Sequence, residues 1–451
     1  MSHCAPPSSA VIAGLGRTGL SCARYLHALG WKIAVTDTRA HPPELAALRE
    51  LDPAIAVRTG GLDTSMLSEA VCVVASPGIA LSAPFFVEAR RRGLQIVGDI
   101  ELFARAVDAP VVGITGTNGK STVTTLVGRM AERAGIAVRV GGNLGEPALD
   151  LLTAAKRAAV PTELYVLELS SFQLEATASL SLKAATVLNV TPDHLDRYAS
   201  VEDYAAAKAR IFARCDTAVI NLDDPLVVAM PRPGQRTLSF SLRASIGADY
   251  AVATRDDQWW LTRREEALLP VGAMRIKGLH NAANALAALA LGEALGLPLP
   301  AMLAELESFA GLPHRSQWVA EVNGVTYIND SKGTNVGATV AAVSGMTGPL
   351  VMIAGGDGKN QEFGALAEAF RGKVRHVVLI GRDAPAIAAA LQGVTSTQSC
   401  GSLQEAVKAA ASAARPGDTV LLSPACASLD MFRDYTHRGT VFAQAVKELA
   451  A

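Results

Sequence analysis

Apolar and polar positions follow two periods along the chain, and together they predict strands with covering helices. Short apolar runs, such as residues 10–13 and 110–114, have the length and β-branched content of buried strands. Longer Ala- and Leu-rich stretches between them, such as residues 120–134, repeat apolar residues at helical spacing. Strands that alternate with helices in this way are typical of parallel sheets with crossover helices, so the expected class is α/β.

The strand-then-helix pattern restarts three times, which predicts three domains. Strands at 10–13 and 110–114 each lead into a helix, and further strands follow a Gly- and Pro-containing break at 311–314. The length of 451 residues agrees, because single hydrophobic cores rarely serve more than about 300 residues. The expected domains are 1–106, 107–312 and 313–451. The other expected strands are 32–36, 164–167, 184–190, 325–329, 350–354, 376–380 and 419–422.

Composition and charge narrow the classes of function. Hydrophobic residues make up 50% of the chain and charged residues 18%, as in a packed globular enzyme, and the formal net charge is -1. Lys and Arg are scattered, so the sequence has no basic stripe of the kind that binds nucleic acid. The most apolar stretch, 285–303, contains Glu293, Pro298 and Pro300, which favours a buried helix and its exit over a membrane span.

The cysteines and the first residues bear on the compartment. Residues 1–9 lack the basic and apolar regions of a signal peptide. The six cysteines form no C-x-x-C pair, which argues against a disulfide framework and against a zinc ribbon. A cytoplasmic location is expected.

The segment 113–121 has the properties of a phosphate-binding loop. It reads Gly-Ile-Thr-Gly-Thr-Asn-Gly-Lys-Ser and lies between an apolar run and a predicted helix, where backbone N–H groups form an anion site. Lys120 can reach the outer phosphates of a nucleotide, and the Ser121 hydroxyl can bind Mg²⁺. The loop departs from the Walker A pattern, which needs glycine at position 114. An ordinary glycine-rich turn is the alternative, but it does not account for the lysine and the hydroxyl together.

A second glycine loop near the N-terminus resembles a dinucleotide-binding fingerprint. Gly14, Gly16 and Gly19 follow a strand, and Asp37 lies eighteen residues later at the end of the next strand. This pattern is weak by itself. It raises the alternative of an NAD-linked oxidoreductase, which would leave the loop at 113–121 without a role.

Acidic residues and a histidine follow two further strands. Glu168 comes after the strand 164–167, and Asp193, His194 and Asp196 come after the strand 184–190. Ligands of open α/β sheets bind at the carboxyl ends of strands, so Glu168 is a candidate Mg²⁺ ligand beside the phosphate loop. Taken singly, such a glutamate is more often a helix cap, and such a histidine is more often structural.

Further motifs occur in an order that resembles the Mur ligase family. The phosphate loop fits that family's G-T-x-G-K-[ST] pattern, and six other motifs follow it at 167–175, 189–197, 280–281, 312–315, 329–332 and 355–359. Two more segments, 35–39 and 423–428, are similar to those of the members that add D-glutamate. The resemblance covers most of the chain and implies a Rossmann-like N-terminal domain, a central P-loop ATPase-like domain and a Rossmann-like C-terminal domain.

The activity that this resemblance implies is ADP-forming, ATP-dependent amide ligation in peptidoglycan precursor synthesis, a process that serves cell-wall biogenesis, cell shape and cell division. The implied substrates are UDP-N-acetylmuramoyl-L-alanine and D-glutamate, which would be joined through an acyl-phosphate and a tetrahedral intermediate. The implied cofactors are ATP and Mg²⁺, with no nucleic-acid or membrane partner and a monomeric state. Another Mur-type or folylpolyglutamate-type ligase is the alternative, with the oxidoreductase less favoured.

The resemblance also assigns residues to roles. The catalytic residues would be Lys120, His194, Lys208, Arg315 and Lys332. ATP would contact Gly116, Thr117, Asn118, Gly119, Lys120, Ser121, Thr122, Asn281, Asn284, Arg315 and Asp330. The UDP-substrate would contact Gly14, Gly16, Arg17, Thr18, Asp37, Thr38, Arg39, Gly78, Asn143 and His194. The amino acid would contact Thr334, Lys359, Ser428, Leu429 and Tyr435, the last a position where the family often has Phe.

The implied metal ligands are Ser121, Glu168, His194 and Lys208, the last as a carbamate. By its local sequence, Lys208 is a solvated residue of the predicted helix at 202–212. It lies fourteen residues after His194, similar to the family lysine that reacts with CO₂. That reaction needs a neutral amine, which burial favours, and it converts a cation into an oxygen donor for Mg²⁺.

Overall fold

The computed structural model describes residues 8–276, 278–346 and 348–449, which divide into two compact units. Unit 1 contains the described chain up to Val190, His194–Phe240 and Ala287–Met302. Unit 2 contains Thr191–Asp193, Ser241–Leu286 and the chain from Leu303 onward. Three sheets built mainly of parallel strands confirm the expected three-domain α/β architecture. The domain boundaries near residues 106 and 312 stay a prediction.

The N-terminal sheet of unit 1 has five parallel strands in the order β3-β2-β1-β4-β5. The strands are β1 (Ser9–Ala13), β2 (Lys32–Asp37), β3 (Ala56–Thr59), β4 (Cys72–Ala75) and β5 (Gln95–Val97). The helices are α1 (Arg17–Ala28), α2 (Leu45–Leu51), α3 (Pro84–Arg91) and α4 (Asp99–Ala104), with a 3₁₀ turn, η1 (Thr64–Ser68). The expected strands at 10–13 and 32–36 are confirmed, each with one additional residue.

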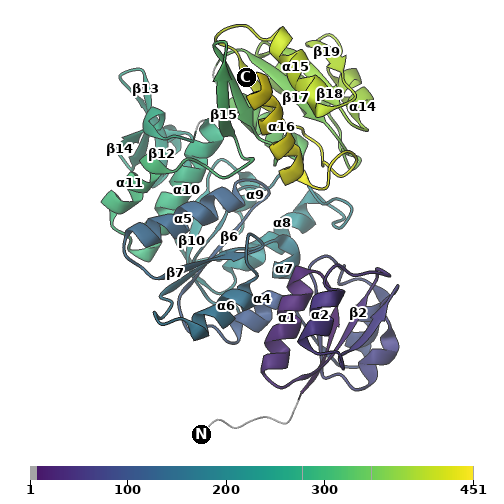
Figure 1. Ribbon diagram of the computed structural model, residues 1–451. Helices are drawn as coiled ribbons and strands as arrows, with labels where there is room; N and C mark the ends of the chain where they lie inside the picture. The colour runs from purple at the N-terminus through teal and green to yellow at the C-terminus, as the bar shows by residue number, and fades with distance from the viewer. Residues whose placement is uncertain (1–7, 277, 347, 450–451) are drawn as a thin grey trace. The chain divides into compact units, whose positions relative to one another are not determined.

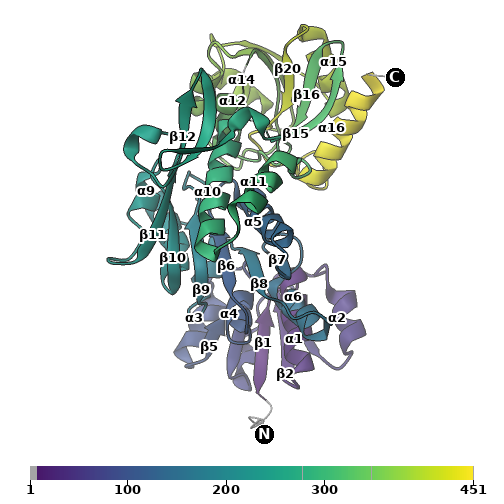
Figure 2. The ribbon, with the colours of Figure 1, turned by 90° about the vertical axis from the view of Figure 1, so that its left-hand side faces the viewer.

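The central strand β1 is buried on both faces, as its continuous apolar sequence predicts. Ile12 packs into the core formed with α1 and α2, which includes Leu26 and Leu48. Val11, on the opposite face, packs with Phe85 and other apolar residues of α3 and η1. Figure 2 shows β1 between α1 on one side and α3 on the other. This double layer leaves only the ends of the strands open to ligands.

The second sheet of unit 1 is parallel, in the order β11-β10-β9-β6-β8-β7. Its strands are β6 (Val111–Thr115), β7 (Val138–Gly142), β8 (Leu164–Glu168), β9 (Leu182–Val187), β10 (Cys215–Asn221) and β11 (Arg236–Ser241). The helices are α5 (Lys120–Arg133), α6 (Ala148–Arg157), α7 (Ser171–Glu175), α8 (Val201–Ala209) and α9 (Pro225–Val228), with the 3₁₀ turn η2 (Arg210–Phe212) after α8.

Strand β9 is shorter than the sequence predicts. Residues 184–190 were expected to be extended, but β9 ends at Val187. The Leu188 N–H still donates to the carbonyl of Thr115, the last residue of β6, but the next residue contacts the phosphate loop, where the Asn189 carbonyl accepts from the Thr117 N–H. Asn189 therefore binds a loop instead of a neighbouring strand.

Unit 2 contains an antiparallel meander and a six-stranded sheet. The meander strands are β12 (Tyr250–Arg255), β13 (Gln258–Arg263) and β14 (Glu266–Pro270), flanked by the 3₁₀ turns η3 (Ala244–Ile246) and η4 (Val271–Ala273). The six-stranded sheet has the order β15-β16-β20-β17-β18-β19 and is parallel except for the β15–β16 pair. These strands are β15 (Gln317–Val322), β16 (Val325–Asn329), β17 (Leu350–Gly355), β18 (Val374–Ile380), β19 (Ser396–Ser399) and β20 (Thr419–Leu422).

Helices cover both faces of the six-stranded sheet. They are α12 (Val336–Gly345), α13 (Gly364–Phe370), α14 (Ala384–Ala390), α15 (Leu403–Ala413) and α16 (Tyr435–Leu449). One core joins α12, α13 and α14 to the sheet through residues such as Val343 and Leu366. The other joins α15 and α16 through Val407 and Phe442, and Figure 1 shows these two helices side by side. The expected strands at 325–329 and 419–422 are confirmed without change.

The most apolar stretch folds as two helices, α10 (Leu279–Leu295) and α11 (Leu299–Ser308). Pro298 lies between them and Pro300 lies in the first turn of α11, where a missing N–H breaks no helical hydrogen bond.

Among the described helices, none is both long and apolar enough to cross a membrane. Within the described residues the five cysteines are unbridged, and burial raises the pKa of Cys72 to about 11 and those of Cys215 and Cys426 to about 12.

Candidate functional site

A cavity of about 600 Å³ in unit 1 lies at the carboxyl ends of β1, β2 and β4, and we call it the glycine-loop pocket. Every residue predicted to contact the UDP-substrate lines it except His194. Eight further lining residues were not predicted as ligands: Gly19, Ser76, Pro77, Ile79, Gly142, Gly145, Pro147 and Gln173. The pocket therefore combines the first glycine loop with the segment after β7, far apart in the sequence.

The glycines of this loop are required by close backbone approach. A Cβ atom at Gly19 would lie 1.9 Å from the carbonyl oxygen of Gly14, so no other residue fits there without moving the loop. Gly16 precedes α1 and no side chain caps that helix. An uncapped helix N-terminus facing a pocket is suited to an anionic group such as a diphosphate.

Asp37 fixes the opposite wall of the pocket. One carboxylate oxygen accepts from the Arg39 N–H at 2.8 Å, and the other accepts from Arg39 Nη2 at 2.7 Å and from the Leu15 N–H at 2.6 Å. Burial alone would raise the pKa of Asp37, but the hydrogen bonds from Arg39 and Leu15 outweigh it and lower the pKa to about 2. Asp37 is thus ionised at neutral pH and joins the glycine loop to the end of β2.

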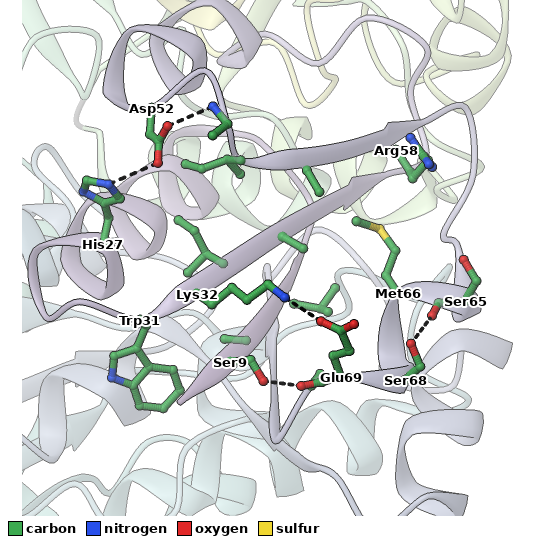
Figure 3. A pocket seen from close by; sticks show the side chains of 18 residues that line it. Ser9, His27, Trp31, Lys32, Asp52, Arg58, Ser65, Met66, Ser68 and Glu69 are labelled. Atoms are coloured by element: carbon green, nitrogen blue, oxygen red, sulfur yellow. Dashed lines mark hydrogen bonds and ion pairs between the residues drawn. The ribbon is translucent and has the colours of Figure 1, made fainter. Parts of the chain in front are cut away.

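A second cavity, of about 470 Å³, lies at the amino ends of the strands of the same sheet (Figure 3). Its charged side chains are engaged with one another: Lys32 Nζ lies 2.5 Å from Glu69, and His27 Nε2 lies 3.5 Å from Asp52. No glycine loop or helix N-terminus lines this cavity. Substrates of open α/β sheets bind at the carboxyl ends of strands, so the glycine-loop pocket is the better candidate for a nucleotide.

Hydrogen bonds tie the two sheets of unit 1 together around the glycine-loop pocket. Arg17 Nη2 donates to the Gly145 carbonyl at 2.8 Å, and the Ser21 hydroxyl donates to Asp150 at the same distance. Asp99 accepts from Gln173 Nε2 at 2.8 Å, and burial raises the pKa of Asp99 to about 6.

The phosphate loop follows β6 and ends at the N-terminus of α5. Gly119, with φ of 84°, precedes the helix in a conformation that favours glycine. Lys120 Nζ lies over the loop and donates to the carbonyl oxygens of Gly116 and Thr117 at 2.9 and 2.8 Å. Asn189 accepts from the Asn118 N–H at 2.8 Å and so braces the loop from outside.

The two oxygen ligands predicted for Mg²⁺ lie in contact beside this loop. The buried Glu168 accepts from the Ser121 hydroxyl at 2.5 Å, and its other oxygen accepts from Asn143 Nδ2 at 2.7 Å. Hydroxyl and carboxylate oxygens suit a hard cation such as Mg²⁺. Among the residues that the structure describes, no three His, Cys, Asp or Glu side chains gather as a metal cluster, and Mg²⁺ is commonly bound by one or two carboxylates together with several water molecules.

Lys208 is buried, with an exposed fraction of 1%, so the solvated position favoured by its local sequence is wrong. Its Nζ donates to the Gly116 carbonyl at 2.9 Å and to the Thr115 hydroxyl at 3.5 Å, and it lies 4.4 Å from the centre of the Tyr204 ring. The Gly116 oxygen therefore accepts from both Lys120 and Lys208. Two ammonium groups on one carbonyl oxygen repel each other in a poorly hydrated site.

His194 lies outside the glycine-loop pocket, within an aromatic cluster. Its ring centre is 4.9 Å from that of Phe172 and 6.0 Å from that of Tyr204, the ring that also contacts Lys208. Its φ of 55° is unusual for a residue other than glycine. His194 and Lys208 thus both neighbour the Tyr204 ring, while His194 does not line the glycine-loop pocket.

In unit 2, Asp330 is held on both carboxylate oxygens. One accepts from the Ser316 N–H at 3.0 Å and the other accepts from the Ser423 hydroxyl at 2.8 Å. Burial raises the pKa of Asp330 to about 6, against the opposing effect of these hydrogen bonds. Arg315, next to Ser316, is therefore positioned in part through Asp330.

Asn281 and Asn284 are buried in the first turns of α10, where Asn284 Nδ2 donates to Asn281 Oδ1 at 3.2 Å. Neither side chain is therefore a solvated helix residue. Their contact with ATP stays a prediction.

The residues predicted for the amino acid occupy two groups of loops in unit 2. In the first group, Lys332 Nζ lies 4.0 Å from the centre of the Tyr435 ring, and Thr334 follows two residues later. The second group contains Lys359, Ser428 and Leu429. Its two loops are paired, because the N–H groups of Asp357 and Ala427 each donate to the other residue's carbonyl oxygen at 3.0 and 2.8 Å.

Three residues with clear structural roles were not predicted. Asn189 and Gln173 lie inside motifs of the sequence analysis and could have been identified from them. Arg438, described below, has no such signal, because an arginine in the first turn of a helix is usually exposed.

Two anion-binding loops, with a hydroxyl–carboxylate oxygen pair beside the second, define a nucleotide-dependent α/β enzyme of the phosphate-loop class. Family models match most of the chain. They are the Mur ligase MurD-like N-terminal domain at residues 8–98, the Mur ligase middle domain at 114–292 and the Mur ligase glutamate ligase domain at 314–426. The chain belongs to the Mur ligase family, whose members depend on ATP and Mg²⁺.

Individual relatives agree with this assignment over their full length. A UDP-N-acetylmuramoylalanine–D-glutamate ligase of Nitrosococcus oceani is 52% identical over 444 residues, which is 98% of this chain and 97% of the relative. A ligase with the same name from Pseudomonas aeruginosa is 50% identical over 100% of both chains. The crystal structure of UDP-N-acetylmuramate-alanine ligase from Thermotoga maritima, at 18% identity and a TM-score of 0.61, covers 98% of this chain and 99% of its own and is similar in fold.

Proposed function

We propose that this protein joins D-glutamate to UDP-N-acetylmuramoyl-L-alanine with hydrolysis of ATP to ADP and phosphate, as a step in peptidoglycan precursor synthesis. The main support is identity of about half of all positions with ligases of that name, over essentially the whole chain. The folding of two anion-binding loops into one unit gives independent support, because the reaction needs a site for a sugar nucleotide and another for a triphosphate.

The chemistry follows from the poor reactivity of a carboxylate toward amines. The alanyl carboxylate takes the γ-phosphoryl group of ATP, and ADP leaves. The amine of D-glutamate then attacks the acyl-phosphate carbon, giving a tetrahedral intermediate that releases phosphate and a proton and forms the amide. Catalysis is mainly positioning and stabilisation of spread negative charge.

In this proposal, the phosphate loop from Gly116 to Thr122 binds the triphosphate. Lys120 exchanges its present contacts with the Gly116 and Thr117 carbonyls for phosphate oxygens. Ser121 and Glu168 hold Mg²⁺, which would supply positive charge to the phosphate oxygens. Arg315 and Lys332 of unit 2 provide further positive charge to the transferred phosphoryl group.

The proposal includes carbamylation of Lys208. Its support is the Gly116 carbonyl, on which the Nζ atoms of Lys120 and Lys208 each donate a hydrogen bond at 2.9 Å. Lys208 first loses a proton, and its neutral amine then adds CO₂ and releases a second proton, so one of two repelling cations becomes an anion. The carbamate keeps one N–H, which can still donate to Gly116, and it adds two oxygens as metal ligands. His194 is the remaining proposed ligand, and the support for it is that both His194 and Lys208 neighbour the Tyr204 ring.

The remaining assignments complete the proposal. The glycine-loop pocket holds the UDP group, with Asp37, Thr38 and Arg39 at the uridine and Asn143 along the sugar-peptide arm. Asn281 and Asn284 contact the adenine and Asp330 the ribose. Thr334, Lys359, Ser428, Leu429 and Tyr435 bind D-glutamate. The enzyme is proposed to act as a cytoplasmic monomer with domains at 1–106, 107–312 and 313–451.

The test is phosphate release by the purified protein with ATP, Mg²⁺ and substrates omitted in turn. Turnover should require both UDP-N-acetylmuramoyl-L-alanine and D-glutamate, because phosphoryl transfer needs the acceptor carboxylate and product release needs the amine. Preference for another amino acid in a panel would favour a different ligase of the family. Dependence on NAD as the required nucleotide would favour the oxidoreductase.

A further inference from the structure

Arg438 is the largest fully buried side chain of the described residues, with an exposed fraction of 0%. It lies in the first turn of α16 and donates four hydrogen bonds to neutral oxygens. Nε donates to the Ser331 hydroxyl at 3.0 Å and Nη2 to the Ser331 carbonyl at 2.8 Å, while Nη1 donates to the carbonyls of Cys426 and Ala427 at 3.1 and 3.3 Å. Burial lowers the pKa of Arg438 to about 10, so it is charged at neutral pH.

On one side, the guanidinium fixes the segment that carries Lys332. Ser331 precedes Lys332, and its hydroxyl donates to the Tyr435 carbonyl at 2.8 Å while accepting from Arg438. The Tyr435 ring in turn lies under the Lys332 ammonium. Displacement of Ser331 would therefore move both side chains.

On the other side, the guanidinium fixes the segment before Ser428. Its two acceptors there, Cys426 and Ala427, lie directly before Ser428 and Leu429. Ala427 is also paired with Asp357, two residues before Lys359. One side chain thus connects both groups of loops proposed to bind the amino acid.

The second segment needs such support, because its backbone is strained. Ala425 has a φ of 61°, in the left-handed region that side chains other than glycine rarely adopt, and it is fully buried. Strained conformations of this kind persist only where the surrounding structure holds them. The bonds from Arg438 to the next two carbonyls provide that restraint.

We propose that Arg438 is a positioning residue that sets the spacing between the two halves of the amino-acid site. The proposal rests on the function proposed above for Thr334, Lys359, Ser428, Leu429 and Tyr435. Arg438 contacts none of the reacting atoms and acts through Ser331, Cys426 and Ala427. Only a planar group with several donors in fixed directions can hold oxygens on two sides, so a lysine ammonium is a poor replacement.

The test is the KM of each substrate for Arg438→Lys, compared with the unaltered enzyme. The KM for D-glutamate should rise by about 10- to 100-fold, since a displacement of about 1 Å in a binding group can change rates by that order. The KM for UDP-N-acetylmuramoyl-L-alanine should stay within about twofold, since its proposed pocket lies in unit 1. Arg375→Lys is the matched control, because Arg375 is in the same unit and contacts Asp418 instead of these loops.

A milder variant covers the case in which Arg438→Lys does not fold. Ser331→Ala removes one acceptor of Arg438 and should raise the KM for D-glutamate in the same selective way, by a smaller factor. An unchanged KM for D-glutamate in the folded variants, or an equal rise for both substrates, would overturn the positioning role. Failure of the unaltered enzyme to use D-glutamate would instead contradict the proposed function, which separates the two outcomes.

Discussion

Lys208 and Arg438 are two cations that the fold removes from water, one in each unit, and they are held in different ways. Arg438 donates to four neutral oxygens in a fixed arrangement, so its charge is spread over well-directed hydrogen bonds. Lys208 shares the Gly116 carbonyl with Lys120, lies 3.5 Å from the Thr115 hydroxyl and lies over the Tyr204 ring. The first environment suits a permanent cation.

The second environment suits a group that changes its charge. An amine can lose a proton and react with CO₂, whereas a guanidinium does neither under ordinary conditions. Burial of an ammonium next to another ammonium is unfavourable, so the proposed carbamylation of Lys208 would remove that unfavourable interaction. Burial alone therefore does not tell whether a charged side chain stays charged; its hydrogen-bond partners must be known as well.

The largest expected effect comes from the lysine that shares the Gly116 carbonyl with Lys208. Lys120→Ala should lower product formation by at least about 100- to 1,000-fold, the range for loss of a charge-stabilising donor in an active site. Affinity for the UDP-sugar, measured by calorimetry, should be nearly unchanged. Arg39→Ala is the reciprocal control, since it should raise the KM for the UDP-sugar and leave that for ATP unchanged. Loss of UDP-sugar affinity in Lys120→Ala would contradict this division between the loops.

Substitution of Lys208 tests whether its charge or its conversion matters. Both Lys208→Ala and Lys208→Arg should lose about 10- to 100-fold in activity, the range for groups that support a metal site. Acetate should partly restore Lys208→Ala, because a small carboxylate can occupy the vacated space, and it should not restore Lys208→Arg. Full activity of Lys208→Arg would mean that a cation is sufficient at this position, as at Arg438, and would contradict the proposed difference between the two sites.

The smallest effect is expected at the buried acid Asp99, where substitution changes stability instead of activity. Its pH dependence measures how strongly burial alone disfavours a charge, as at Lys208 and Arg438. Burial raises the pKa of Asp99 to about 6 from 3.8, so the native state favours the protonated form. The stability associated with that proton is present below about pH 4 and is lost as the pH rises through about 6. Asp99→Asn should therefore be more stable than the unaltered protein above pH 6, by about 1 to 3 kcal/mol in urea unfolding, with the difference vanishing below pH 4. Parallel stability curves across that range would contradict the shift.

Much of the fold could be predicted because parallel strands buried on both faces leave a simple pattern. The strands β1 and β6 and the glycine loops after them could be predicted, because each strand is an apolar run that leads directly into glycines. The end of β9 could not be predicted, because Asn189 lies between two apolar residues in the sequence but binds the phosphate loop in the structure, where it accepts from the Thr117 and Asn118 N–H groups. Local sequence does not record that choice between a strand and a loop partner.

Burial of single charged residues was the other limit. Lys208 and Arg438 are both buried cations on helices, which local sequence does not indicate, and for Lys208 the solvated position that it favours is wrong. The family resemblance singled out Lys208 by its position fourteen residues after His194, while nothing in the motifs pointed to Arg438. Its role depends on Ser331 and Cys426, which lie 107 and 12 residues away and meet only in the folded unit.

A buried thiol in each unit allows local unfolding of that unit to be measured separately. Cys215 begins a strand of unit 1, and Cys426 lies in the loop that Arg438 holds in unit 2. Because burial raises the pKa of both thiols to about 12, neither is reactive while the native structure is closed. The rates at which an alkylating reagent modifies the two residues therefore measure local unfolding in each unit separately, and the rate at Cys426 measures opening of the loop that Arg438 holds.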